Sequence, residues 1–404
     1  MKISTGTKII FTIIIIVIIV ILIVIFFKGS RDNADNIVDI FGEDADIKEF
    51  KQVQDLYNLS SLKDYRSYNP CIFTVNGSNE PFYVYRMCNF ILCPGKQHKW
   101  DSNNRERTKS YTFIENPKGE LFMVNHKNIS KEKCEVGGQD ARAFVYKDML
   151  CLVCNVPSGE NCRREMVMMT FKLDEFLIES TSTKVKSGMY RKYVREVIPE
   201  KIIKLNIDFD NDRDQKNWMP FVIGDDIYFV YSVNPHVILK YDGKRCIKYA
   251  ETITDKLPTN LRGGSQIIRV KKWNPKFEAT IGKTKNYIDY RSEDLFLGVI
   301  HTRESTSQYV TYIYAFEITY PFKVKYITKG FIFGGKTSHS KRIQFASGIA
   351  RIYENNISYM HITYGENDCD SKYCIIKEET MLNALIPINK YKEEMLSYDE
   401  NELV

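Results

Sequence analysis

The sequence has little excess of either charge. Lys and Arg number 57 and Asp and Glu number 51, which gives a formal net charge of +6 over 404 residues. The two signs are interspersed, and no basic stripe alternates with aromatic residues, so nucleic acid is not an expected partner. The sequence also contains neither a Gly-x-Ser-x-Gly nucleophile elbow nor a Gly-Lys-Ser/Thr phosphate-binding loop. The first absence argues against one common type of hydrolase site, and the second argues against one common type of nucleotide-binding site.

No metal-binding motif is complete. Four Asp residues at alternate positions from 208 to 214 resemble the start of a calcium loop, but Arg213 stands where that loop needs Gly and Met219 where it needs Glu. Cys151 and Cys154 fall within an apolar strand-like run, in which residues three apart point to opposite faces. The two sulfur atoms are therefore not expected to share a metal or redox site. We therefore expect no metal and no cofactor.

One long hydrophobic run is present, at residues 9–27, where Thr12 is the single polar residue. A helix rises about 1.5 Å per residue, so this run predicts a transmembrane helix across a hydrocarbon core of ~30 Å. A cleaved signal peptide is the alternative, but the apolar run is longer than usual and no small-x-small cleavage site follows it. Around this signal-anchor we expect a short tail at residues 1–8 and a polar stalk at residues 28–67.

All ten cysteines follow this run, an even number that is typical of a disulfide-bonded lumenal or extracellular domain. Four Asn-x-Ser sequons indicate the same side of the membrane. The expected protein is thus a single-pass, type II membrane glycoprotein with a lumenal or extracellular C-terminal domain. The candidate glycosylation sites are Asn58, Asn76, Asn128 and Asn356.

Residues 68–388 contain short apolar runs rich in aromatic and β-branched residues, separated by turns and without a sustained helical period. An acidic tail, residues 389–404, follows. Five hairpins are predicted, each followed by further strands: 71–75 with 82–85, 143–146 with 149–153, 220–223 with 227–231, 265–270 with 295–300, and 348–353 with 358–363. Five units of four strands predict an all-β, five-bladed β-propeller, and a pair of β-sandwiches is the alternative.

Polar residues stand at the same end of all five hairpins, because antiparallel strands return to the end at which they started. In a propeller this end becomes one mouth of the central channel. Each residue alone is typical of a turn, but five coinciding sets favour a ligand with many hydroxyls or with phosphate groups. The set comprises Asn69, Arg86, Asp140, Arg142, Asn217, His236, Arg262, His301 and Asp368.

Three of these sets carry a resemblance to a known family. Asn69-Pro70 with Arg86, the stretch Gly138 to Phe144, and Tyr364-Gly365-Glu366-Asn367-Asp368 resemble motifs of the five-bladed β-propeller carbohydrate-active enzymes of the mannoside-phosphorylase and mannosyltransferase type. Gln139 stands where that family usually has Glu, and Ala141 where it has Pro. Gln139 lacks a negative charge that would help to raise the pKa of Asp140.

The resemblance implies a membrane-anchored glycosyltransferase or glycoside phosphorylase that works by a single inverting displacement. Asp140 corresponds to the family's proton donor. Phosphate oxygens are expected on Arg86, Arg142, Arg262 and His301, and sugar hydroxyls on Asn69, Asn217, His236 and Asp368. The expected partners are a sugar phosphate or sugar nucleotide and a glycan acceptor. The rival hypothesis is a non-catalytic propeller that binds glycan or protein at a cell or virion surface.

Overall fold

A computed structural model describes residues 35–50, 65–75, 78–89, 91–93, 96–98, 109–126, 137–158, 163–177, 194–209, 215–270, 294–303, 308–334 and 343–391. The chain divides into two compact units, residues 1–35 and 36–404. The predicted transmembrane run at residues 9–27 lies outside the described residues. Within the ranges given above, no helix has the length and apolar character needed to cross a membrane.

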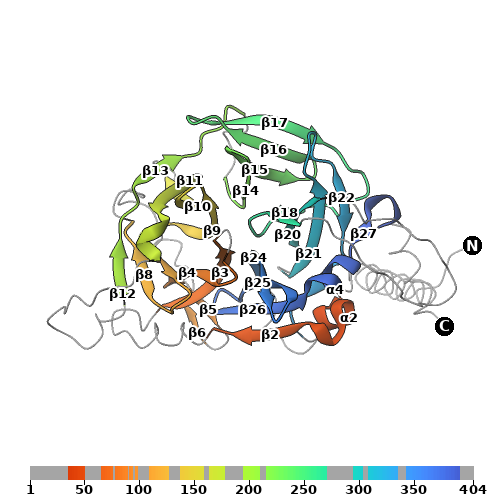
Figure 1. Cartoon of the computed structure of the whole chain (residues 1–404), viewed down its shortest axis with the longest axis horizontal. Helices are drawn as coiled ribbons and strands as arrows, with labels where there is room; N and C mark the ends of the chain where they lie inside the picture. The colour runs from red at the N-terminus through yellow and green to blue at the C-terminus, as the bar shows by residue number, and fades with distance from the viewer. Residues whose placement is uncertain are drawn as a thin grey trace, which may run out of the picture. The chain divides into compact units, whose positions relative to one another are not determined.

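The second unit is all-β and propeller-like (Figure 1). Its strands pair into sheets that are mostly antiparallel, and the helices among the described residues are short. One sheet contains β3 (Arg66–Thr74), β4 (Pro81–Cys88), β7 (Ser110–Glu115), β8 (Leu121–Val124) and β12 (Val194–Val197). The next two contain β9 (Gln139–Tyr146), β10 (Met149–Ser158), β11 (Arg163–Lys172) and β13 (Lys201–Lys204), and then β14 (Met219–Ile223), β15 (Asp226–Val233), β16 (His236–Tyr241) and β17 (Cys246–Thr252).

The later part of the chain forms an eight-stranded sheet and a four-stranded sheet. An eight-stranded sheet includes β18 (Arg262–Gly263), β19 (Ile268–Val270), β20 (Leu295–Arg303), β21 (Tyr309–Glu317), β22 (Val324–Ile327), β23 (Phe331–Ile332) and β27 (Ile386–Pro387). A four-stranded sheet contains β24 (Gln344–Glu354), β25 (Ile357–Glu366), β26 (Asp370–Lys377) and β2 (Asp46–Glu49). A separate hairpin joins β5 (Ile91–Cys93) to β6 (Lys96–His98).

The five predicted hairpins form, as β3–β4, β9–β10, β14–β15, β19–β20 and β24–β25. The first strands β3, β9, β14 and β24 lie toward the centre in Figure 1, and β3 contacts both β9 and β24. Apolar side chains fill the spaces between neighbouring sheets. Phe73 and Ile114 of the first sheet, for example, pack in one cluster with Leu150 and Met169 of the second. This arrangement brings the same end of every inner strand to the centre.

Part of the predicted stalk belongs to the folded unit. Strand β2 adds to β26 as the last strand of its sheet, with Ile47 opposite Cys374. Just before it, α2 (Ile37–Phe41) buries Ile37 and Phe41 in the core. Acidic residues surround these positions, so the spacing of the apolar residues among them was not recognised in the sequence. The fold therefore includes residues well before the expected start at residue 68.

The described cysteines also differ from expectation. Six of them are free, buried thiols, so the predicted disulfides are wrong for Cys71, Cys88, Cys151, Cys154, Cys246 and Cys374. Cys369 is disulfide-bonded. The six free cysteines act as small hydrophobic side chains. Burial raises the pKa of Cys151 to about 12, which keeps its sulfur in the thiol form.

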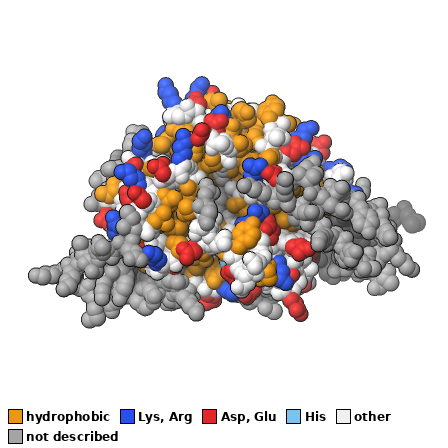
Figure 2. Space-filling model, viewed as in Figure 1, with side chains coloured by type: hydrophobic (Ala, Val, Ile, Leu, Met, Phe, Trp, Pro, Cys, Tyr) orange, Lys and Arg blue, Asp and Glu red, His pale blue; other side chains and the backbone are white. Residues whose placement is uncertain are grey.

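The surface agrees with the balanced charge of the sequence. On the face shown in Figure 2, Lys and Arg side chains are interspersed with Asp and Glu side chains among the residues that are coloured. Side chains of opposite charge form ion pairs on β15, β16 and β17, such as Lys240 with Asp226 and Lys248 with Glu251.

Candidate functional site

Three neighbouring sheets place a polar residue with an unusual backbone at the same end. Asn69 in β3, Asp140 in β9 and Asn217 just before β14 have φ angles of 52°, 51° and 63°. Residues other than Gly rarely adopt positive φ, and Asn and Asp tolerate it best. Such strained positions concentrate at functional sites. The repeated conformation therefore marks this end of the inner strands as the candidate site.

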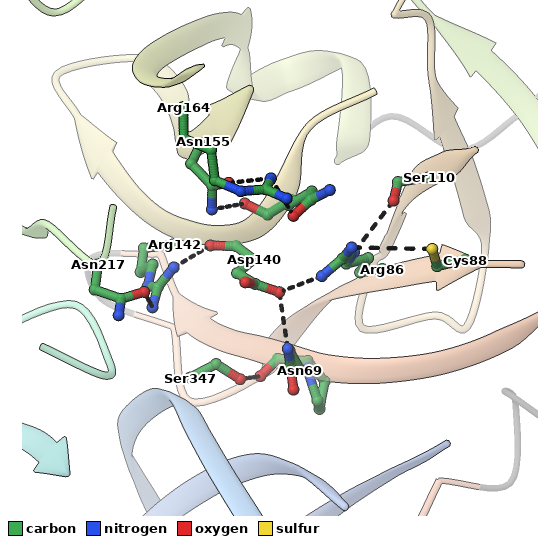
Figure 3. A network of polar contacts seen from close by, with 12 residues as sticks. Asn69, Arg86, Cys88, Ser110, Asp140, Arg142, Asn155, Arg164, Asn217 and Ser347 are labelled. Carbon is green, nitrogen blue, oxygen red and sulfur yellow. Dashed lines mark hydrogen bonds and ion pairs between the residues drawn. The ribbon is translucent and has the colours of Figure 1, made fainter. Parts of the chain in front are cut away.

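Asp140 lies at the centre of a hydrogen-bond network, which Figure 3 shows. Its Oδ1 accepts one hydrogen bond from Nδ2 of Asn69 at 2.8 Å and another from Nη1 of Arg86 at 2.9 Å. Oδ2 of Asp140 has no hydrogen-bond partner among the residues in the ranges given above. One carboxylate oxygen is thus fixed by the protein, and the other remains available.

Arg86 is itself held in place. Its Nε donates to Oγ of Ser110 at 3.2 Å, and its guanidinium carbon lies 4.9 Å from the centre of the Tyr68 ring. Burial alone would raise the pKa of Asp140, but the charges of Arg86 and Arg142 and the hydrogen bonds from Asn69 and Arg86 outweigh it and lower this pKa. Asp140 is therefore a carboxylate at neutral pH.

Arg142 joins three sheets. It is fully buried. Its Nε donates to the carbonyl oxygen of Gly264 at 2.8 Å, its Nη2 to Oδ1 of Asn217 at 3.3 Å, and its Nη1 to the carbonyl oxygen of Asp140. All three nitrogens thus bond to the protein, and the guanidinium lies 5.3 Å from the centre of the Phe345 ring. This geometry makes Arg142 a support of the site rather than an open phosphate ligand.

Asp368 provides the second carboxylate. It follows β25 and has a φ of 47°. Close to it in the chain, Gly365 packs on Asn69, so closely that a Cβ added to Gly365 would lie 2.1 Å from Oδ1 of Asn69. The carboxyl group of Asp368 has no hydrogen-bond partner among the described residues. Burial and the negative charge of Asp140 raise its pKa to about 6, against the opposing charge of Arg86.

Positive charges gather on the side of the site formed by β18 and β20. His301 in β20 is opposite Arg262 in β18, and it stacks on Tyr309 with 5.0 Å between ring centres. Burial, joined by the charges of Arg142, Arg262 and Lys216, lowers the pKa of His301 to about 3. His301 is therefore neutral and offers hydrogen bonds rather than a charge. Arg262 is exposed and forms no ion pair within the described part of the chain.

His236 is not brought to this site. It is buried in β16, where Nδ1 donates to the carbonyl oxygen of Phe322 at 2.9 Å and the ring packs on Phe316. Burial lowers its pKa to about 4. The structure does not bring His236 together with the other predicted sugar-binding residues, because its side chain packs between two sheets. His236 is the first residue of β16, and the sequence did not show which way a side chain at that position faces.

Several residues of the site were missed. Oε1 of Gln139 accepts a hydrogen bond from Nη1 of Arg164 at 2.6 Å, and the same nitrogen donates to Oδ1 of Asn155 at 3.0 Å. Figure 3 shows Asn155 and Arg164 side by side, and Arg164 links Asn155 to Gln139, the residue before Asp140. Tyr309 was also missed. Burial raises the pKa of the Tyr309 phenol, and the negative charges of Asp368 and Asp140 also raise it. The available signal in the sequence was that Gln139 and Asn155 stand at the same end of the second predicted hairpin, where the structure pairs them.

The arrangement therefore combines one ionised carboxylate, one carboxyl group that titrates close to neutral pH, a neutral imidazole and an exposed arginine. Within the described residues no group of His, Cys, Asp and Glu is placed to bind a metal ion. Such a set can transfer a proton and hold an anion without changing its own structure.

Of the predicted glycosylation sites, Asn356 is exposed in the turn between β24 and β25, whereas Asn58, Asn76 and Asn128 lie outside the described residues.

No protein-family model matches the chain, and no curated protein matches it either. Solved structures do match. The β-1,2-mannobiose phosphorylase from Listeria innocua is 14% identical, with a TM-score of 0.49 over 84% of this chain and 99% of that chain. A putative glycoside hydrolase from Bacteroides ovatus is 10% identical, with a TM-score of 0.47 over 79% and 88%. The chain is also similar to MPT-4, a mannose phosphorylase from Leishmania mexicana solved with phosphate ion, at 11% identity and a TM-score of 0.40 over 83% and 95%.

Proposed function

We propose that this protein is a carbohydrate-active enzyme that moves a glycosyl group between a glycan and a phosphate-bearing molecule. A glycosyltransferase and a glycoside phosphorylase are the two forms of this reaction. The observation that carries the proposal is the pair of carboxyl groups, Asp140 and Asp368, which lie in opposite electrostatic environments beside Arg86. Pairs of titratable groups whose pKa values are pushed apart are typical of acid–base catalysis.

The second support is the position of the cations. Burial lowers the pKa of His301, and the positive charges of Arg142, Arg262 and Lys216 lower it further. Because Arg262 has no ion pair with a described residue, its guanidinium is available to the oxygens of a phosphate group. The sugar hydroxyls would bind on the other side, to Asn69, Asn217 and the carboxyl groups. The motif resemblance of the first, second and last units supports the same assignment.

In the proposed reaction, the anomeric carbon is attacked from the face opposite the leaving oxygen, which inverts its configuration. One carboxyl group exchanges a proton with the bridging oxygen, and the arginines stabilise the negative charge of the phosphate. The donor is a sugar phosphate or sugar nucleotide, and the acceptor is a glycan hydroxyl.

A non-catalytic glycan-binding propeller is the second candidate. The observation that favours it is the extent to which the site is already bonded to itself. Arg142 uses all three nitrogens on protein atoms, and Oδ1 of Asp140 accepts two hydrogen bonds. A rigid site of this kind can recognise a sugar without turning it over.

The deciding experiment is an assay of the full chain in detergent with a panel of sugar 1-phosphates, sugar nucleotides and short glycans with inorganic phosphate. Release of phosphate or nucleotide, or formation of a sugar 1-phosphate, is the expected result. Glycan binding in a calorimeter with no turnover of any member would favour the binding protein and contradict the enzyme.

The proposal extends to the architecture around the site. We infer that the ring has five blades, with the eight-stranded sheet serving as one of them, and that residues 9–27 anchor it in a membrane. The catalytic unit would then stand on the lumenal or extracellular side, as in type II membrane enzymes that act on glycans. Protease protection of residues 36–404 in sealed microsomes tests this topology.

A further inference from the structure

A cavity of about 280 Å³ lies at the end of the first sheet that is opposite to the candidate site. Pro81 and Tyr83 line it near the β3–β4 turn, whereas Arg86 lies toward the other end of β4. Its volume is close to the lower limit of about 300 Å³ for ligand pockets, so it suits a compact ligand about the size of one six-membered ring. The cavity is therefore separate from the site around Asp140.

Glu115 lines this cavity and carries a carboxyl group that is only partly satisfied by the protein. The residue is 3% exposed. Its Oε2 accepts a hydrogen bond from the hydroxyl of Tyr85. Among the residues that the structure describes, Oε1 has no hydrogen-bond partner and the carboxyl group forms no ion pair. Because a buried carboxylate is normally paired with a cation, Glu115 lacks the partner that its burial calls for.

The aromatic ring beside this carboxyl group is fixed in place. Tyr83 is directly opposite Glu115 across β4 and β7, so the two side chains lie on the same face of the sheet. The Tyr83 ring packs on Phe50 and Tyr373, with ring centres 5.0 and 6.4 Å apart. Burial raises the pKa of Tyr83, and the charges of Tyr373, Glu115 and Glu354 raise it further. The ring is thus held from behind in a negative electrostatic environment.

The remaining lining combines rigid apolar rings with charged groups. Pro81 and Pro117 contribute the rings. Glu80 and Lys118 are exposed and also line the cavity. Together with Glu115, the described lining carries two carboxyl groups and one ammonium group, so its net charge is negative. Complementarity therefore favours a ligand with a positive charge and an apolar body.

We propose that this cavity binds a small organic cation, a primary ammonium group on a skeleton about the size of one six-membered ring. The ammonium group donates to Oε1 of Glu115, and the skeleton packs against Tyr83 and the two prolines. A primary ammonium group suits this position better than a hydroxyl, because it supplies both N–H donors and the charge that the buried carboxylate lacks. This binding site goes beyond the proposed function, and its ligand takes no part in the reaction at Asp140.

The test is calorimetric titration of the full chain in detergent at pH 7 with two matched pairs of probes. The first pair is cyclohexylamine and cyclohexanol, and the second is glucosamine and glucose. The amine of each pair should bind at least about tenfold more tightly than its neutral partner, because its hydrogen bond is charge-assisted. Tighter binding of glucosamine would identify the natural ligand as an amino sugar, and tighter binding of cyclohexylamine an apolar amine. Equal binding within both pairs would overturn the proposal.

Glu115→Gln removes the charge while keeping the size of the side chain and an acceptor for Tyr85. This variant should lose the preference for the amine in both pairs. The matched control is Glu251→Gln, which removes the same charge from β17 of another sheet, where Glu251 pairs with Lys248. It should bind the probes like the unmodified protein. Unchanged amine affinity in Glu115→Gln would refute the site, and the comparison within each pair decides the proposal even if that variant does not fold.

A competition experiment locates the bound amine. Saturating mannobiose and inorganic phosphate should not displace it, because the cavity and the candidate site lie at opposite ends of β4. Displacement by these compounds would place the amine in the candidate site and overturn the inference. Binding is measured here without any transfer of sugar, so a lack of turnover contradicts the proposed function and leaves this inference intact.

Discussion

Arg86 and Asp140 form an ion pair that connects two sheets, with 2.9 Å between Nη1 of Arg86 and Oδ1 of Asp140. Both side chains are largely buried, at 10% and 17% exposure. In such a pair the loss of one partner leaves the other charged and without compensation in a medium of low dielectric. The pair therefore links the stability of the fold to the charge state of the candidate site.

Asp140→Asn should destabilise the fold at neutral pH by about 3 kcal/mol, because it leaves the Arg86 charge buried and unpaired. The folded-state pKa of Asp140 is lowered, so the stabilisation it provides is present above the ordinary Asp pKa and is lost as the pH falls through the folded value. Urea unfolding at several pH values measures this, and the difference between variant and unmodified protein should shrink at acid pH. An unchanged unfolding midpoint at neutral pH would refute the structural role.

Asp368→Asn should have the opposite effect on stability. The pKa of Asp368 is raised from 3.8 to about 6, so ionising it in the folded state costs up to about 3 kcal/mol. This cost is absent below the unfolded pKa and is fully present above the folded pKa. The Asn variant should therefore melt at a higher temperature than the unmodified protein at pH 7 and at the same temperature at pH 3.5. A lower melting temperature at pH 7 would show that the carboxylate is stabilised by contacts other than those described.

The sequence predicted the hairpins because β-branched and aromatic runs, turn residues and antiparallel pairing are all local properties. It did not predict that β2 would complete the sheet of β26, since that pairing joins residues more than 300 positions apart. It also placed the polar residues at one end but could not say which way each faces. His236 shows this limit, because burial beside Phe316 depends on the packing of two sheets.

The charge state of Asp140 could not be predicted from the sequence for a related reason. The motif around Asp140 identified a carboxyl group at the mouth of the ring. The state of that carboxyl group depends on Asn69 and Arg86, which come from another sheet. Asp368 was recognised only as a contact for sugar hydroxyls, because its lack of hydrogen-bond partners is a property of the folded chain.

Asn356→Gln tests the side of the membrane on which the folded unit lies. Asn356 is exposed in the turn between β24 and β25, and Glu354 pairs with Ile357 at this end of the hairpin, whereas Gln344 pairs with Glu366 at the other. A glycan on Asn356 would therefore stand away from the site. Expression in a glycosylation-competent host should give a protein whose gel mobility increases with endoglycosidase, by a smaller step for Asn356→Gln.

Asn355→Gln is the matched control, since Asn355 lies in the same turn outside the sequon. It should shift like the unmodified protein. A lack of any shift on endoglycosidase treatment of the unmodified protein would contradict a lumenal or extracellular location.

Arg262→Ala should weaken phosphate binding without weakening the fold. Arg262 is exposed, lies in the short strand β18 opposite His301, and makes no ion pair with a described residue, so its removal leaves no buried charge behind. A charge-assisted contact to phosphate contributes about 1.5–3 kcal/mol, which corresponds to roughly a 10- to 150-fold loss of affinity. Calorimetric titration with inorganic phosphate measures this loss, and the melting temperature should stay within about one degree of the unmodified value.

Arg245→Ala provides the comparison. Arg245 is also exposed, but it lies at the turn between β16 and β17, with Asp208 at 3.4 Å and Asp242 at 3.9 Å. Arg245→Ala removes the same net charge from the chain as Arg262→Ala. Any general effect of charge on phosphate binding will therefore be equal in the two variants and will decrease with added salt. A loss specific to Arg262→Ala places the phosphate beside His301. An equal loss in both variants would mean that phosphate is attracted by the overall charge, and Arg262 would no longer be a ligand.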